Sequence, residues 1–124
     1  MIRWLSFIRY PDGITIEEGD RWFLGTRAQE LKQLKGICRY LTWKSEETPG
    51  ARPGRPWNRL TEIGFRDWPS LRAAMANFPV VAAPPWGEPG FEVESIFVAD
   101  NPEYDFFRDT PAWLEAEHRQ GEPK

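Results

Sequence analysis

Four segments of the chain alternate between apolar and polar residues with the period of two that is typical of β-strands. They cover residues 3–10, 37–44, 58–65 and 91–100. The first of them ends at the turn signal Pro-Asp-Gly, residues 11–13. The pattern therefore predicts four strands.

Other segments space their apolar residues three or four positions apart, as amphipathic helices do. The first is 14–36, where Thr15 and Glu18 have the spacing of a capping box. Gly19 and Gly25 lie inside this segment and should each cost about 1 kcal/mol relative to alanine. We therefore expect a close packing contact or a local distortion at these two glycines.

The second helical segment runs from about Trp68 to Asn77, with Asp67 as its N-cap. A short third helix is predicted in the C-terminal tail, where Thr110 precedes Pro111 at the first helical position.

The order of the main elements is β-α-β-β-α-β, which predicts an α+β, ferredoxin-like sandwich. We expect one domain over residues 1–124, with a core at about 2–100 and a C-terminal extension at 101–124. The proline-rich segments 45–56 and 79–90 are predicted to be irregular loops, and their role is left open.

One face of such a sheet is covered by helices, and the other needs a different cover. We place Leu5, Phe7, Leu41, Trp43, Ile63 and Phe65 on the helix-packed face. The opposite face then receives Trp4, Ser6, Ile8, Tyr10, Cys38, Tyr40, Thr42, Lys44, Leu60, Glu62 and Gly64. Its mixture of rings, hydroxyls and one carboxylate is typical of a small-molecule site.

Composition narrows the classes of partner. Sixteen basic and nineteen acidic residues give a net charge of −3, which disfavours nucleic acid as a partner. No segment approaches the ~18 apolar residues of a membrane span, so we expect a cytoplasmic protein. The single cysteine, Cys38, cannot form an intrachain disulfide and is predicted to be a buried structural thiol.

The sequence lacks the motifs that several kinds of enzyme chemistry require. No group of His, Cys and carboxylate residues has metal-ligand spacing, and neither a glycine-rich phosphate loop nor a Gly-x-Ser-x-Gly elbow is present. The only histidine, His118, lies in the polar tail. We expect neither a metal nor another cofactor, haem included. The seven Trp, eight Phe and three Tyr suit a core, an interface or a pocket for a flat ligand.

Three blocks of the sequence resemble the EthD-like family of the dimeric α/β barrel superfamily. They are FIRYPDGITIEEGDRWF, LKGICRYLTW and WNRLTEIGFRDWPSLRAAM. The resemblance implies a homodimer that pairs two ferredoxin-like sheets, with a pocket in each subunit. Where the family usually carries a histidine near the end of its first helix, this sequence has Arg27, which stays protonated and cannot shuttle protons.

Glu62 is the sequence's best candidate for a general acid or base, because an aromatic-lined cavity would disfavour its ionised form. Alternatively, Glu62 faces water or forms an ion pair with Arg27, Arg59 or Lys44. Tyr40 or Tyr10 would polarise a substrate oxygen, and Arg27 or Lys44 would hold negative charge. The complete set of predicted substrate contacts is Trp4, Ser6, Tyr10, Trp22, Thr42, Lys44 and Trp86.

The resemblance implies a cofactor-independent lyase, dehydratase or isomerase that moves a proton on a small aromatic or ring-derived oxygenated substrate. Two alternatives stay open at this point. One is a cofactorless monooxygenase acting on phenolic substrates, and the other is a non-catalytic accessory protein that binds a small molecule.

Overall fold

The computed structural model describes residues 1–46, 56–79, 82–88 and 90–121. Four of its elements are strands: β1 (Ile2–Arg9), β2 (Ile37–Lys44), β3 (Arg59–Phe65) and β4 (Glu92–Ala99). The helical elements are α1 (Ile16–Trp22), the π-helix η1 (Phe23–Arg27), α2 (Ala28–Leu31), α3 (Trp68–Ala76) and α4 (Ala112–Gly121).

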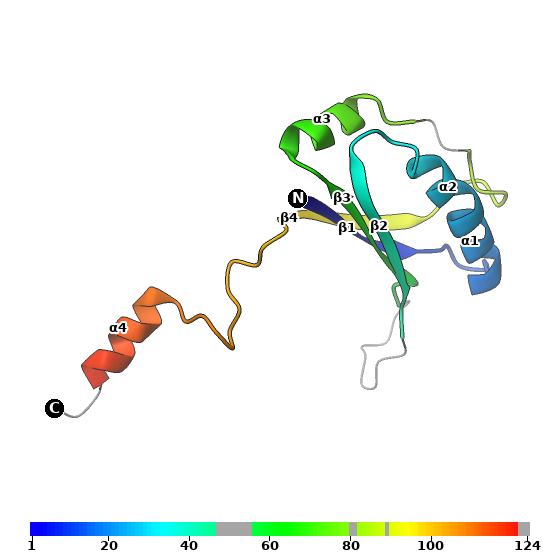
Figure 1. Cartoon of the computed structure of the whole chain (residues 1–124). Helices are drawn as coiled ribbons and strands as arrows, with labels where there is room; N and C mark the ends of the chain where they lie inside the picture. The colour runs from blue at the N-terminus through cyan, green and yellow to red at the C-terminus, as the bar shows by residue number, and fades with distance from the viewer. Residues whose placement is uncertain (47–55, 80–81, 89, 122–124) are drawn as a thin grey trace.

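The strands form one antiparallel sheet in the order β2-β3-β1-β4. Helices α1, α2 and α3 lie on the same side of this sheet, whereas α4 stands at the end of a tail that leads away from it (Figure 1). The predicted ferredoxin-like fold is thereby confirmed. Among the described residues, the helices are all too short or too polar to cross a membrane.

The segment predicted as one long helix is divided into α1, η1 and α2. Thr15 caps α1 by accepting a hydrogen bond from the Glu18 amide at 3.1 Å, as predicted. Both glycine expectations are confirmed. A Cβ added to Gly19 would lie 2.2 Å from the Tyr10 ring, and Gly25 falls inside the π-helical turn.

Helix α3 begins as the sequence predicts. The Asp67 side chain accepts a hydrogen bond from the Ser70 amide at 2.8 Å, with Pro69 in the first turn. The predicted tail helix is also present as α4, and its side chains are exposed apart from the half-buried Leu114. Most of the predicted loop 45–56 lies outside the described residues.

Strand register decides which side chains share a face, because directly opposite residues point to the same side of a sheet. Trp4 is opposite Ile63, and Ile63 is opposite Tyr40. Leu5 and Leu41 are both opposite Glu62, on the other face.

The face assignment made for β3 is therefore confirmed, and those made for β1 and β2 are wrong. Trp4, Ser6, Tyr40 and Thr42 face the helices, while Leu5, Phe7, Leu41 and Trp43 lie on the open face with Glu62. Both sets are partly apolar, so alternation separates them without showing which one the helices cover. Cys38 is also exposed, contrary to prediction, because β2 is an edge strand.

The core under the helices consists of two separate apolar clusters. The first contains Ile2, Ile63, Phe65, Leu71 and Ala74, with Trp4, Leu34, Ile37, Tyr40 and Met75 packed against it. The second contains Ile8, Tyr10, Trp22 and Phe23, with Ile14, Leu24, Trp86 and Phe91 packed against it. A polar row of residues on the sheet separates them.

Candidate functional site

Four hydroxyl side chains form a row across all four strands on the helix-facing side of the sheet. Thr42 is opposite Thr61, Thr61 is opposite Ser6, and Ser6 is opposite Ser95. The Ser6 and Ser95 hydroxyl oxygens are 2.8 Å apart, and those of Thr42 and Thr61 are 3.3 Å apart. We call these four residues the hydroxyl row. It is a polar floor between the two apolar clusters.

Trp4 and Tyr40 lie beside the hydroxyl row on the same face of the sheet, two residues along their strands toward the first cluster. The indole N–H of Trp4 is buried and has no hydrogen-bond partner among the described residues. The Tyr40 hydroxyl has no hydrogen-bond partner in the described part of the chain either. An unpaired buried polar group is costly, and the Trp4 indole nitrogen is such a group.

Arg27, the last residue of η1, completes this group from above the sheet. Its guanidinium lies 4.8 Å from the centre of the Phe91 ring and has no ion pair with any described residue. Burial lowers the pKa of Arg27, and the charge of Tyr40 acts in the opposite direction. Burial raises the pKa of Tyr40, and the charge of Arg27 opposes that shift. The two side chains are thus close enough to feel each other's charge.

The structure brings together the predicted residues Trp4, Ser6, Tyr40, Thr42 and Arg27 on one side of the sheet. Their chemistry is that of an anion-stabilising site. Because its pKa is raised, Tyr40 stays a neutral hydrogen-bond donor, and Arg27 contributes a cation. Together they can hold negative charge that develops on a ligand oxygen.

A charged network closes the far end of the hydroxyl row. Asp20 of α1 accepts hydrogen bonds from the Arg59 Nε at 2.8 Å and from the Tyr10 hydroxyl at 2.7 Å. Burial raises the pKa of Asp20, but the bonds from Arg59 and Tyr10 and the charge of Lys44 leave it below the ordinary value. Burial, followed by Asp20, raises the pKa of Tyr10. Tyr10 and Lys44 therefore serve this network.

Glu62 lies on the opposite face and is 3% exposed. Its Oε1 lies 3.3 Å from Arg3, and its Oε2 lies 2.5 Å from the Arg39 Nε. The second contact is a close charge contact without the alignment of a hydrogen bond. The expected ion-pair partners Arg27, Arg59 and Lys44 are replaced by Arg3 and Arg39, which share its face. Glu62 is thus separated by the sheet from Tyr40 and Arg27.

Trp22 and Trp86 meet in a different place. Their rings are 5.5 Å apart in an edge-to-face arrangement, and they line a cleft of about 450 Å³ together with Arg21 and Thr26. Each indole N–H donates to a main-chain carbonyl, that of Ala82 or Gly90. The cleft therefore offers ring faces, not indole donors.

Sequence reasoning missed Thr61, Ser95, Asp20 and Arg59. Thr61 and Ser95 could have been found by aligning the hydroxyl residues at the centre of each predicted strand. The register needed for that alignment follows from strand pairing and is not visible in a single strand. No group of three or more His, Cys, Asp or Glu side chains within the described residues is arranged to hold a metal ion.

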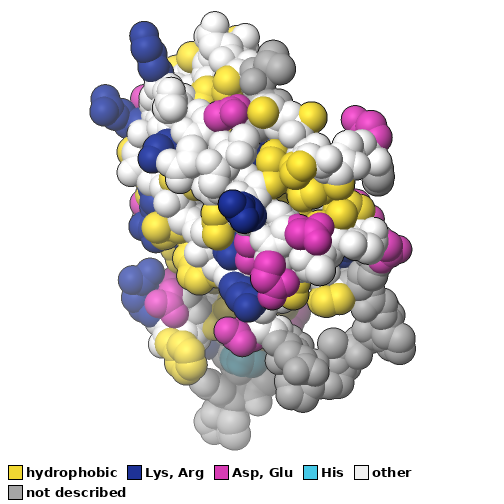
Figure 2. Space-filling view, turned by 90° about the vertical axis from the view of Figure 1, so that its right-hand side faces the viewer, with side chains coloured by type: hydrophobic (Ala, Val, Ile, Leu, Met, Phe, Trp, Pro, Cys, Tyr) yellow, Lys and Arg dark blue, Asp and Glu magenta, His cyan; other side chains and the backbone are white. Residues whose placement is uncertain are grey.

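Charges on the surface beside α1 and α2 are mixed in sign. Figure 2 shows acidic and basic side chains next to one another over the middle of this face. This is a surface without one dominant field.

The fold and the hydroxyl row define the class of protein: an α+β ferredoxin-like domain with a polar row beneath its helices. No model of a known protein family matches this chain, and no curated protein matches its sequence.

Two solved structures share the fold. An ethyl tert-butyl ether d (EthD) family protein from Bacillus halodurans superposes with a TM-score of 0.57 and 13% identity, over 82% of this chain and 99% of that chain. At3g17210 from Arabidopsis thaliana superposes with a TM-score of 0.59 and 11% identity, over 84% of this chain and 99% of that chain. The chain therefore has an EthD-like fold, as its sequence suggested.

Proposed function

We propose that this protein binds a small, oxygenated, ring-containing molecule between its helices and its sheet, beside Trp4, Tyr40 and Arg27. One observation carries the proposal. These three neighbouring polar groups, half-buried on the same side of the sheet, have no hydrogen-bond partner within the described residues. A phenolate, enolate or carboxylate oxygen would satisfy Tyr40 and Arg27 together.

The same pair supports proton-transfer chemistry as the second candidate function. A cofactor-independent lyase, dehydratase or isomerase needs a group that stabilises an enolate-like oxygen, and a neutral tyrosine beside an arginine does so. In this proposal Glu62 is not the proton acceptor, because it is on the other face and paired with two arginines. The acceptor is then a group of the substrate or a water molecule.

The binding test uses β-naphthol, followed by quenching of tryptophan fluorescence. Tyr40→Phe and Arg27→Met should each weaken binding about tenfold, because each removes one charge-assisted hydrogen bond worth about 1.5 kcal/mol. The methyl ether of β-naphthol should bind weakly to the unmodified protein. The same variants are then assayed for exchange of the α-hydrogens of β-tetralone in D₂O, which reports proton transfer.

Matched controls are Tyr104→Phe and Arg72→Met, both at exposed positions outside the proposed site. Unchanged affinity in Tyr40→Phe and Arg27→Met would refute the proposed site. Binding without exchange would leave a binding protein and remove the enzymatic candidate. Oxygen uptake with β-naphthol would instead point to the monooxygenase.

We also propose that two copies of the chain pair through the open face of the sheet. Large apolar side chains are exposed there: Phe7 at 39%, Leu41 at 37%, Trp43 at 46% and Ile96 at 54%. Such an apolar surface is costly in water and is typical of an interface.

Replacing Trp43 by lysine should weaken this dimer at least about tenfold, because a charge would be buried within the apolar interface. Sedimentation equilibrium measures the effect, with Phe107→Lys as control, since Phe107 is fully exposed in the tail. A protein that is monomeric at high concentration, or a Trp43→Lys dimer of undiminished affinity, would contradict the pairing.

A further inference from the structure

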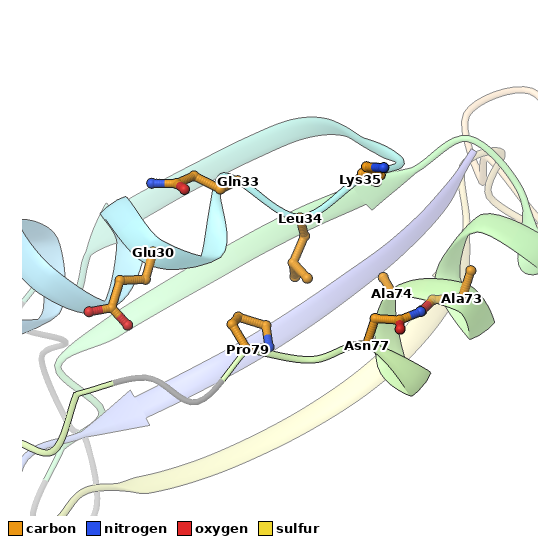
Figure 3. Close-up of a pocket in the computed structure, with 8 residues that line it drawn as sticks. All are labelled: Glu30, Gln33, Leu34, Lys35, Ala73, Ala74, Asn77 and Pro79. Carbon is orange, nitrogen blue, oxygen red and sulfur yellow. The ribbon is translucent and has the colours of Figure 1, made fainter.

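A second hollow lies between α2 and α3, on the outer side of the first apolar cluster. It has a volume of about 630 Å³, within the usual range for small-molecule sites. Figure 3 shows Leu34 pointing from the turn after α2 toward Pro79 and Ala74 on the α3 side. Leu34 and Ala74 also pack in the cluster that contains Trp4 and Tyr40, so the floor of the hollow is apolar. We call this hollow the α2–α3 cleft.

Two amide side chains on opposite walls of the cleft are fixed by main-chain carbonyls. Gln33 donates from Nε2 to the Gln29 carbonyl at 3.3 Å, and Asn77 donates from Nδ2 to the Ala73 carbonyl at 2.8 Å. Each amide oxygen accepts no hydrogen bond from the described residues. The walls therefore present acceptors, which suit ligand hydroxyl groups.

The two ends of the cleft have opposite charges. Lys35 lies at one end and Glu30 at the other (Figure 3). The Glu30 carboxylate is engaged, because its Oε2 accepts from the Ala82 amide at 3.2 Å. Lys35 makes no ion pair with any described residue. A ligand with one acidic group would pair with Lys35, and its hydroxyl groups would donate to the amide oxygens on the walls.

We propose that the α2–α3 cleft is a separate binding site for a small hydroxylated aromatic acid. In this arrangement the ring rests on Leu34, Ala74 and Pro79, the acid pairs with Lys35, and the hydroxyls donate to Gln33 and Asn77. The site needs neither Tyr40 nor Arg27, so it stands or falls independently of the function proposed above.

The test compares three probes by ¹⁵N NMR titration of the whole chain: gallate, benzoate and pyrogallol. Gallate carries both features, benzoate lacks the hydroxyls and pyrogallol lacks the acid. Gallate should bind about tenfold more tightly than either, because each missing feature removes at least one hydrogen bond or ion pair. The shifts should be largest at the amides of Leu34, Ala73 and Asn77.

Lys35→Met and Gln33→Met should each weaken gallate binding about fivefold, while Lys32→Met, on the same turn, should not. Lys35 and Gln33 are exposed, so both variants are expected to fold. Equal affinity for the three probes, undiminished binding in Lys35→Met, or shifts centred on Trp4 and Tyr40 would each overturn the proposal. The last outcome would assign the ligand to the first site.

Discussion

Replacing both Arg3 and Arg39 by methionine is expected to lower the free energy of unfolding by about 3 kcal/mol, the low end of the range for broken buried ion pairs. The reason is the carboxylate that stays behind. Glu62 is 3% exposed, and the two arginines are its ion-pair partners among the described residues. Without them a charge is buried with no compensation. Urea unfolding at neutral pH measures the loss.

The matched control removes the carboxylate as well. Adding Glu62→Leu to the double variant should restore most of the lost stability, because apolar side chains of similar size often replace a buried ion pair without net cost. Arg72→Met, at an exposed position of α3, should change stability by less than about 0.5 kcal/mol. Equal stability of the double and triple variants would show that Glu62 is not the buried charge that matters.

The fold could be predicted because its signals are local. Asp67 and Pro69 mark the start of α3, and Thr15 with Glu18 marks the start of α1. The costs expected at Gly19 and Gly25 also pointed to real features, the Tyr10 contact and the π-helical turn. Each of these features depends mainly on residues that are near one another in the chain.

The site could be predicted only in part, because its residues meet through strand register. Trp4, Tyr40 and Arg27 were named from the sequence, and the structure places them on one side of the sheet. Glu62 was placed with them wrongly. A shift of one residue moves a side chain to the other face, and both faces of β1 and β2 carry large apolar residues.

The π-helical turn of η1 explains why the structure places Arg27 in the candidate site. A π-helical turn inserts one extra residue and changes the direction of the side chains that follow it. Here that turn ends at Arg27, which lies over Phe91 and near Tyr40. Regular helical spacing does not predict this position.

The second large effect is expected from Asp20→Asn, which should cost about 3 kcal/mol of stability at pH 7. Asp20 holds Arg59 through bonds of 2.8 and 3.1 Å, and the Arg59 side chain is only 10% exposed. Loss of the carboxylate leaves that guanidinium without its counter-ion. The asparagine keeps one oxygen that can still accept from the Tyr10 hydroxyl, but its NH2 group replaces the oxygen that binds the second Arg59 nitrogen, so α1 loses its charged attachment to the sheet.

This loss should depend on pH in a defined direction. The pKa of Asp20 is lower in the folded protein than its ordinary value, because Arg59 and Tyr10 outweigh the effect of burial. Its stabilising contribution is therefore complete above about pH 4 and disappears as the pH falls through the folded-state pKa. The stabilities of the unmodified protein and Asp20→Asn should converge as the pH falls through the folded-state pKa of Asp20, below which both lack the charge. Glu117→Gln, at an exposed position of α4, is the control. A different outcome is that the unmodified protein and Asp20→Asn differ in free energy of unfolding by the same amount from about pH 7 to about pH 2. That outcome would mean that the Asp20 charge is not what stabilises the network.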